Sequence, residues 1–146
     1  MALVYFDSSA LVKLLVQERG SELAAELWDR CDAATSSRLA EAEVPAALAA
    51  ANRNHVLTDD ALRHARQGWE RIWASARPAE LTPEVSSAAG ALAVEHPLSG
   101  ADAVHLASAL AVQDAGVIVA VWDRRLHAGC EATGLAVAPA DLDAVP

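Results

Sequence analysis

The sequence predicts an α/β fold in three layers, with a central parallel sheet of about five strands covered by helices on both faces. Two uncharged apolar runs, at 2–6 and 117–122, have the character of strands buried on both faces. The segments between them carry apolar residues at helical spacing, and 35 of the 146 residues are alanine, the best helix former. Strands that alternate with crossover helices favour parallel pairing.

The first part of the chain predicts a strand, two helices and a second strand. The first apolar run stops at Asp7, after which apolar residues continue at helical spacing to Glu18. Gly20 separates this helix from the next, which we expect over 22–31. A brief strand at 33–36 follows.

Proline residues mark the boundaries of the middle helices. A helix over 38–52 contains Pro45, which should kink it or lie in its first turns. Thr58 is a suitable N-cap for a helix that reaches Ala76 and that Pro78 ends. The remaining predicted elements are a weak strand at 79–82, a helix at 83–95 that Pro83 opens, a helix from Ser99 to Ala115 that Gly116 ends, the strand at 117–122, a short helix from Asp123 and a terminal strand at 135–137.

The composition favours a folded, soluble chain with one domain over residues 1–146. Hydrophobic residues make up 53% and charged residues 21%, which argues against disorder. No uncharged apolar run is long enough to span a membrane, and no basic region precedes the first apolar run as in a signal peptide. We therefore expect a cytoplasmic protein. Cys31 and Cys130 lack the spacing of a disulfide scaffold, a zinc site or a redox motif.

The charge balance limits how the chain could bind nucleic acid. Acidic residues outnumber basic ones by 20 to 11, for a net charge of −9, the wrong sign for binding through bulk charge. A polyanionic ligand would need a metal ion or a local basic surface. The segment from Arg53 to Arg77 contains five arginines and only three acids, and it is the candidate surface for steering a polyanion.

Asp7 and Asp123 are the leading candidates for chemistry, because each follows one of the two strongest predicted strands. In open α/β sheets, ligands bind beyond the carboxyl ends of the strands. Each aspartate would also suit a helix N-cap, and Asp102 could close a capping box that Ser99 opens. These acids therefore have a structural interpretation as well as a functional one.

The helix at 38–52 offers two further acids, Glu41 and Glu43. Side chains two positions apart on a helix point about 200° apart, so only one of the two can face the crevice. Glu43 shares its face mainly with alanines, and Glu41 shares its face with Val44 and Leu48. Periodicity does not choose between them.

A cluster of such carboxylates would require a cation. Two carboxylates about 5 Å apart repel by roughly 3 kcal/mol at an effective dielectric constant of 20. Oxygen ligands without His or Cys suit Mg²⁺ or Mn²⁺ rather than zinc. A hard divalent ion binds phosphate and activates water, as phosphodiester hydrolysis requires.

Four blocks of the sequence occur in a characteristic order: VYFDSSALVKLL, TSSRLAEAEV, LSGADAVHLASAL and VWDRRLHAG. In this order and spacing they resemble the PIN-domain ribonucleases, and among these the VapC-type toxins of bacterial toxin–antitoxin pairs. The resemblance spans nearly the whole chain. It implies one PIN-like α/β/α domain over residues 1–146.

The resemblance also implies which residues form the site. Asp7, Glu43, Asp102 and Asp123 would be the catalytic acids and the metal ligands, which selects Glu43 over Glu41. Ser8 or Ser9 would supply the small hydroxyl beside the first aspartate. Many relatives carry Ser or Thr two residues before the last aspartate, where this chain has Val121, so a hydroxyl contact is missing there.

Several other residues near these blocks favour a structural interpretation. His105 follows Asp102 by three residues on the same helical face, where packing or orientation is favoured over proton transfer. The four tryptophans fall in apolar stripes that suit packing better than base stacking. Four basic residues flank the site and could contact phosphate, although solvated surface charge is the commoner role: Lys13, Arg38, Arg124 and Arg125.

The resemblance implies a Mg²⁺-dependent endoribonuclease toxin that hydrolyses cellular RNA such as transfer or ribosomal RNA, with Mn²⁺ as a possible substitute. The competing function is a catalytically silent PIN-like module that acts only by binding protein, and metal titration would distinguish the two. Other phosphoryl-transfer folds are disfavoured, because a haloacid-dehalogenase site needs an aspartate where this chain has Ser9, and a receiver domain needs a lysine after a late strand, whereas Lys13 is the only lysine.

Three partners follow from the same interpretation: an RNA substrate, a cognate antitoxin and a second copy of the chain. A cluster of carboxylates can be neutralised by a guanidinium as well as by a metal, so an antitoxin segment is expected to place Arg or Lys in the acidic pocket. Homodimerisation is expected through large apolar residues of the early helices, namely Leu14, Leu15, Leu27 and Trp28.

Overall fold

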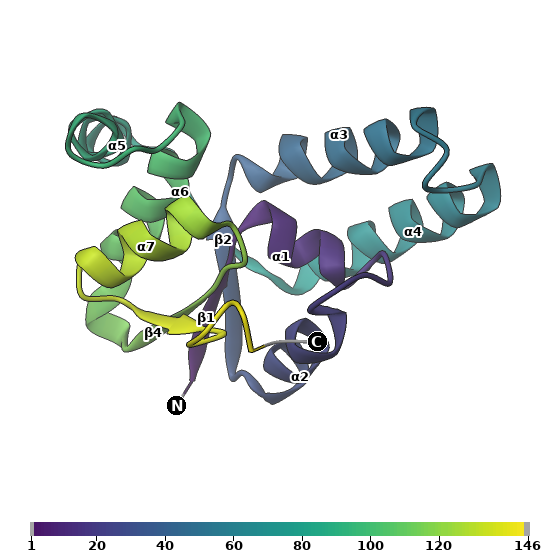
Figure 1. The fold of residues 1–146 in the computed structure, drawn as a ribbon, viewed down its shortest axis with the longest axis horizontal. Helices are drawn as coiled ribbons and strands as arrows, with labels where there is room; N and C mark the ends of the chain where they lie inside the picture. The colour runs from purple at the N-terminus through teal and green to yellow at the C-terminus, as the bar shows by residue number, and fades with distance from the viewer. Residues whose placement is uncertain (1, 145–146) are drawn as a thin grey trace.

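The protein has a five-stranded parallel sheet between two helical layers, in a computed structural model that describes residues 2–144 (Figure 1). The strand order is β3-β2-β1-β4-β5, which confirms the predicted fold class and the number of strands. The elements are β1 (Leu3–Phe6), α1 (Ser8–Lys13), α2 (Ser21–Arg30), β2 (Ala33–Ser37), α3 (Ala40–Arg53), α4 (Asp59–Ser75), β3 (Arg77–Ala79), α5 (Pro83–Glu95), α6 (Gly100–Ala111), a 3₁₀ turn η1 (Gln113–Ala115), β4 (Val117–Ala120), α7 (Arg124–Ala132) and β5 (Ala136–Ala138).

The central strand β1 divides its side chains between two hydrophobic cores. Successive residues of a strand point to opposite faces of the sheet. Val4 and Phe6 belong to the core under α1 to α4, whereas Tyr5 belongs to the core under α6 and α7. All three are at most 2% exposed, because β1 pairs with β2 on one side and β4 on the other. This burial explains why the run is uncharged.

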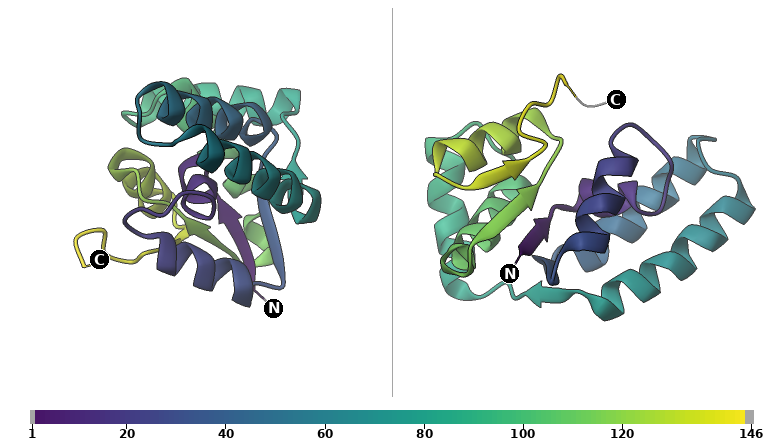
Figure 2. Two further views of the ribbon diagram at one scale, coloured as in Figure 1. Left: turned by 90° about the vertical axis from the view of Figure 1, so that its right-hand side faces the viewer. Right: turned by 90° about the horizontal axis from the view of Figure 1, so that it is seen from below.

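The helices form two unequal layers (Figure 2). Helices α1 to α4 cover one face, and α3 and α4 run side by side away from the sheet. On the other face α6 and α7 pack on the strands, and α5 packs on α6. In the described part of the chain, no helix has the length and apolar character needed to cross a bilayer.

Two predicted boundaries are wrong. The strand expected at 79–82 is β3, which begins earlier, at Arg77. Pro78 was interpreted only as a helix stop, but β3 is an edge strand, where the missing N–H of proline breaks no ladder bond on the open side. The helix expected from Ser99 to Ala115 ends at Ala111, and η1 precedes Gly116, whose φ of 77° glycine adopts without strain.

Other boundaries differ by a few residues. The first helix ends at Lys13 rather than near Glu18, and β4 ends at Ala120 rather than Trp122. The helix α3 continues through Pro45. The helices capped by Thr58 and Thr82 begin as the sequence indicates, since each threonine side chain accepts a backbone N–H from its first turn.

The apolar residues expected to form a dimer surface pack partly against the chain's own core. Leu14, Leu15, Leu27 and Trp28 are partly buried beside the first core, and the Trp28 ring meets Phe6 edge to face at 5.4 Å. Trp69 and Trp73 stack at 5.2 Å in the same core, which confirms a packing role for these tryptophans. All four residues remain partly exposed, so a dimer surface on these helices stays a prediction.

Gly20 allows a test of this packing. Its φ is +89°, and a Cβ there would lie 2.6 Å from Nε1 of Trp122. We expect Gly20→Ala to lower the free energy of unfolding by about 2–4 kcal/mol, the sum of a left-handed backbone penalty of about 1–2 kcal/mol and an overpacking penalty. Urea denaturation measures the loss.

Gly134→Ala is the matched control. Its φ is +84°, but a Cβ there would meet no atom within 4 Å, so only the backbone penalty of about 1–2 kcal/mol applies. Equal losses in the two variants would contradict the close packing of Trp122 on Gly20.

Candidate functional site

A cavity of about 330 Å³ lies at the carboxyl edge of the sheet, where α1 and α7 begin. It gathers side chains from opposite ends of the sequence. All four predicted acids and both predicted serines line it. The lining residues are Asp7, Ser8, Ser9, Val12, Glu18, Glu43, Ala47, Asp102, His105 and Asp123.

Asp7 and Asp123 combine both interpretations that the sequence allowed. Each is an N-cap, since Asp7 Oδ1 accepts the amide of Ala10 at 2.8 Å and Asp123 Oδ1 accepts the amide of Leu126 at 2.9 Å. Both nevertheless line the cavity. A carboxylate has two oxygens, so capping fixes its direction without using up its capacity to bind a cation.

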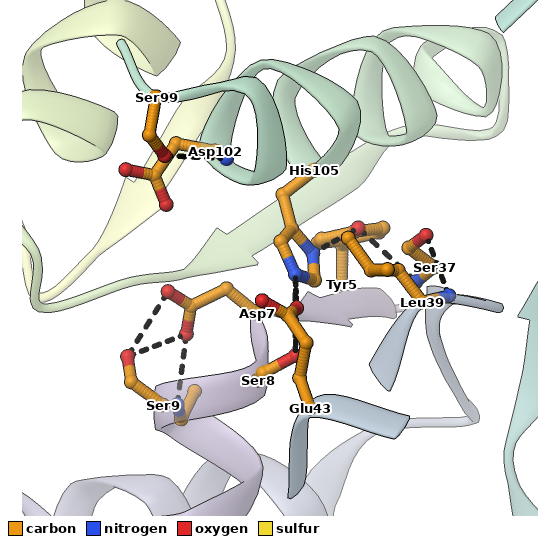
Figure 3. Close-up of polar contacts among 11 residues, drawn as sticks. Tyr5, Asp7, Ser8, Ser9, Ser37, Leu39, Glu43, Ser99, Asp102 and His105 are labelled. Carbon is orange, nitrogen blue, oxygen red and sulfur yellow. Dashed lines mark hydrogen bonds and ion pairs between the residues drawn. The ribbon is translucent and has the colours of Figure 1, made fainter. Parts of the chain in front are cut away.

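The two predicted serines orient neighbouring carboxylates. Ser9 Oγ lies 3.0 Å from each oxygen of Asp7, to which it donates (Figure 3). Ser8 Oγ donates to Oε1 of Glu43 at 2.7 Å, which connects α1 to α3. Successive residues at the start of α1 therefore hold acids on two sides of the cavity.

The structure separates Glu43 from Glu41. The Glu43 side chain is 31% exposed and faces the cavity, whereas that of Glu41 is 54% exposed and forms an ion pair with Arg38 at 3.2 Å. The Glu43 pKa is lowered, chiefly by its hydrogen bond with His105. Glu43 is thus held in its charged form.

A hydrogen-bonded chain of buried groups holds Glu43 (Figure 3). The amide of Ser37 donates to the Tyr5 hydroxyl at 3.1 Å, and that hydroxyl lies 2.7 Å from Nδ1 of His105. His105 Nε2 lies 2.7 Å from Oε1 of Glu43. When the Tyr5 hydroxyl donates its hydrogen bond to Nδ1, the neutral imidazole carries its proton on Nε2. Nε2 then donates a hydrogen bond to Glu43.

The Tyr5 and His105 side chains of this hydrogen-bonded series are almost excluded from water. Tyr5 is 0% and His105 is 3% exposed, and burial raises the pKa of Tyr5 well above its usual value, so the hydroxyl keeps its proton. His105 therefore orients Glu43 across the cavity, the kind of role that its helical position suggested.

Asp102 lies one helical turn before His105, on the same side of α6 (Figure 3). Its backbone N–H is capped by Ser99, at 3.2 Å. Burial raises the pKa of both Asp7 and Asp102, and the neighbouring acids raise both values further. The cavity thus holds negative charges that disfavour one another.

This donor set fits a hard divalent cation. The acids that would hold it are the four predicted ones, and all offer oxygen: Asp7, Glu43, Asp102 and Asp123. A cation would compensate for the burial, and for the smaller repulsion from neighbouring acids, that together raise the pKa values of Asp7 and Asp102. Among residues 2–144, no three His, Cys, Asp or Glu side chains converge closely enough to hold a metal as placed, so the carboxylates would have to turn toward a common point.

Two features of the site escaped the sequence analysis. The first is Glu18, which lines the cavity and forms an ion pair with Lys13 at 3.1 Å. Tyr5 is the other, and its signal was a polar hydroxyl within a fully buried strand, where it needs a partner. Val121, which replaces a hydroxyl residue of many relatives, is fully buried in the second core.

Three arginines of the arginine-rich segment lie on α4, whereas Arg53 ends α3 and Arg77 begins β3. All five arginines are exposed, but the three on α4 share that helix with Asp59, Asp60 and Glu70. Arg63 forms an ion pair with Asp60, so little of this charge is unopposed.

Comparison with known proteins gives consistent results. The PIN domain family model matches residues 4–131. The chain is 65% identical over 143 residues to "Ribonuclease VapC45" and to "Ribonuclease VapC49", from two strains of Mycobacterium tuberculosis, covering 98% of this chain and 99% of each relative.

Solved structures share the fold at lower identity. The M. tuberculosis toxin VapC20, described as cleaving the sarcin-ricin loop, has a TM-score of 0.63 at 19% identity, covering 90% of this chain and 95% of that one. A toxin–antitoxin complex from Klebsiella pneumoniae has a TM-score of 0.61 at 22% identity, covering 88% and 92%. With the family model matched over most of its length, the chain belongs to the PIN-domain family.

Proposed function

We propose that this chain, as one domain over residues 1–146, is a Mg²⁺-dependent endoribonuclease toxin that acts in the cytoplasm and is silenced by a cognate antitoxin. The observation that carries this proposal is the gathering of Asp7, Glu43, Asp102 and Asp123, from separate elements, around one cavity at the carboxyl edge of the sheet. The 65% identical relatives named as ribonucleases support the same activity. The proposed substrate is transfer or ribosomal RNA.

The catalytic role of the four acids is part of this proposal. Together they would hold Mg²⁺, or Mn²⁺ in its place, which would bind the scissile phosphate and lower the pKa of the attacking water. Ser9 fixes the Asp7 carboxylate, and Ser8 and His105 fix Glu43. These contacts hold Asp7 and Glu43 at the cavity wall, so that a turn of the carboxylates toward a common point would be enough to bind the ion.

Asp7→Asn is expected to abolish RNA cleavage and growth inhibition while the protein stays folded. The amide oxygen can still accept the Ala10 N–H, but a charged ligand is lost. Because burial disfavours the Asp7 charge, its removal should leave the melting temperature unchanged or raise it. Nuclease assays and calorimetry measure the two effects.

A folded Asp7→Asn protein with full activity would contradict the assignment of the site. Wild-type protein that neither binds Mn²⁺ in a titration nor cleaves RNA would instead favour a silent module.

Glu43→Gln is expected to reduce activity at least tenfold more than Glu41→Gln. Glu43 faces the cavity and accepts hydrogen bonds from Ser8 and His105, whereas Glu41 is exposed and pairs with Arg38. Removal of a buried charged hydrogen-bond partner costs more than loss of a surface ion pair. Side-by-side assays that give equal losses would reject the role of Glu43.

The antitoxin is expected to place an Arg or Lys among the acids of the cavity. A guanidinium can pair bidentately with a carboxylate and relieve the repulsion that otherwise calls for a metal. Solved toxin–antitoxin complexes with this fold support such a partner. Replacement of the inserted cation with alanine should restore nuclease activity within the complex, and a complex with no antitoxin residue near the cavity would exclude this form of inhibition.

We also propose a homodimer. The partly exposed residues of the early helices, Leu14, Leu15, Leu27 and Trp28, form one candidate surface, and the exposed face of α5 forms a second. Ser87, Ala91 and Val94 lie at helical spacing on α5 and are exposed, and Val94 is 88% exposed. Val94→Asp should shift the protein toward monomer in light scattering, because a charge at the interface would be desolvated. Val56→Asp, at an exposed valine between α3 and α4, is the control and should leave the oligomeric state unchanged. A wild-type protein that is monomeric at high concentration would exclude the dimer.

A further inference from the structure

A second cavity, of about 200 Å³, carries the opposite charge to the acidic one. It is lined by Lys13, Arg19 and Arg124, together with Trp122 and Leu142. Three of the chain's 11 basic residues thus surround one small volume in a protein whose net charge is −9. Such a concentration of positive charge favours an anionic ligand.

The two cavities adjoin at two points. Glu18 lines the acidic cavity and forms an ion pair at 3.1 Å with Lys13, which lines the cationic one. Asp123 and Arg124 are consecutive, so the start of α7 contributes to both. A ligand that spans the cavities would place one anionic group at the acids and a second among the cations.

The cationic side chains are held in position by the fold. The Lys13 side chain is only 12% exposed, and its amino group lies 5.3 Å from the centroid of the Trp122 ring. Trp122 packs in turn on Gly20, where a Cβ would have no room. Arg19 Nη2 donates to the carbonyl of Leu142 at 3.1 Å.

A protein anion already occupies part of this surface. Arg124 forms an ion pair with Asp143, and the two side chains are 70% and 73% exposed. Ion pairs that are so open to water contribute little. A phosphodiester of RNA carries one negative charge, as a carboxylate does, and accepts bidentate hydrogen bonds from arginine. A strand already held at the acidic cavity presents this group at a high effective concentration, so it can replace Asp143 as the partner of Arg124.

We propose that the cationic cavity binds a phosphate of the RNA strand adjacent to the phosphate that is cleaved, and that Asp143 competes with the RNA for Arg124. This inference rests on the proposed function. A single nucleic-acid strand carries phosphates at regular intervals, so a strand seated at the acidic cavity brings a neighbouring phosphate toward the cations, which an isolated acidic side chain of another protein would not do.

The test measures binding of a short single-stranded oligoribonucleotide by fluorescence anisotropy in Mg²⁺ buffer, in the Asp7→Asn background so that cleavage does not interfere. Arg124→Gln should raise Kd about fivefold and lower the dependence of log K on log salt concentration by about 0.7, the value of one single-strand phosphate contact. Asp143→Asn should change Kd in the opposite direction, lowering it about threefold, because it frees Arg124 from its ion pair.

Arg30→Gln is the matched control. Arg30 is also an exposed arginine in an ion pair, with Glu26 at 3.0 Å, but it lies outside the acidic and the cationic cavity. The Kd of this variant for the oligoribonucleotide should therefore stay unchanged. The proposal is overturned if Arg124→Gln binds like its parent, if Asp143→Asn weakens binding, if the oligoribonucleotide does not bind, or if the substitutions alter only binding of a protein partner.

The binding assay also separates this inference from the proposed function. Opposite shifts for Arg124→Gln and Asp143→Asn in a protein whose wild type cleaves no RNA would support the phosphate site and reject the nuclease. Cleavage by the wild type, without these shifts in Kd, would support the nuclease and reject the phosphate site.

Discussion

The burial of acidic charge at the carboxyl edge of the sheet is the constraint on which the rest of the site depends. Asp7 is only 4% exposed, at the end of a strand buried on both faces. A charge excluded from water is costly unless hydrogen bonds or an opposite charge compensate. The Ala10 amide and the Ser9 hydroxyl compensate in part, yet the Asp7 pKa remains raised. The site is thereby predisposed toward a cation.

Glu43 shows the opposite balance. Its hydrogen bonds with Ser8 and His105 outweigh its burial, so its pKa is lowered rather than raised. The cavity thus contains one acid whose charge the protein stabilises and two, Asp7 and Asp102, whose charge it does not. Glu43 differs from Asp7 and Asp102 because it alone of the three hydrogen-bonds the buried imidazole of His105. Residue type alone does not reveal this distinction.

The sequence predicted the fold class and the candidate acids better than it predicted their surroundings. The runs that became β1 and β4 were recognised because strands buried on both faces exclude charge, and Asp7 and Asp123 follow from that placement. Periodicity left Glu41 and Glu43 undecided, since the choice depends on how α3 lies against α1 and on where α6 places His105. The Tyr5–His105 contact joins residues 100 positions apart and requires the pairing of β1 and the seating of α6.

The place of β1 in the sheet bears on how such a protein is made. Its neighbour β4 pairs Leu3 with Val117, so the two central strands meet only after more than a hundred residues have been synthesised. Contacts between such distant segments form late and slowly in folding. Asp123 follows β4, and the acidic cavity is therefore incomplete throughout most of translation. A nascent chain therefore lacks the assembled site until the residues through Asp123 have left the ribosome.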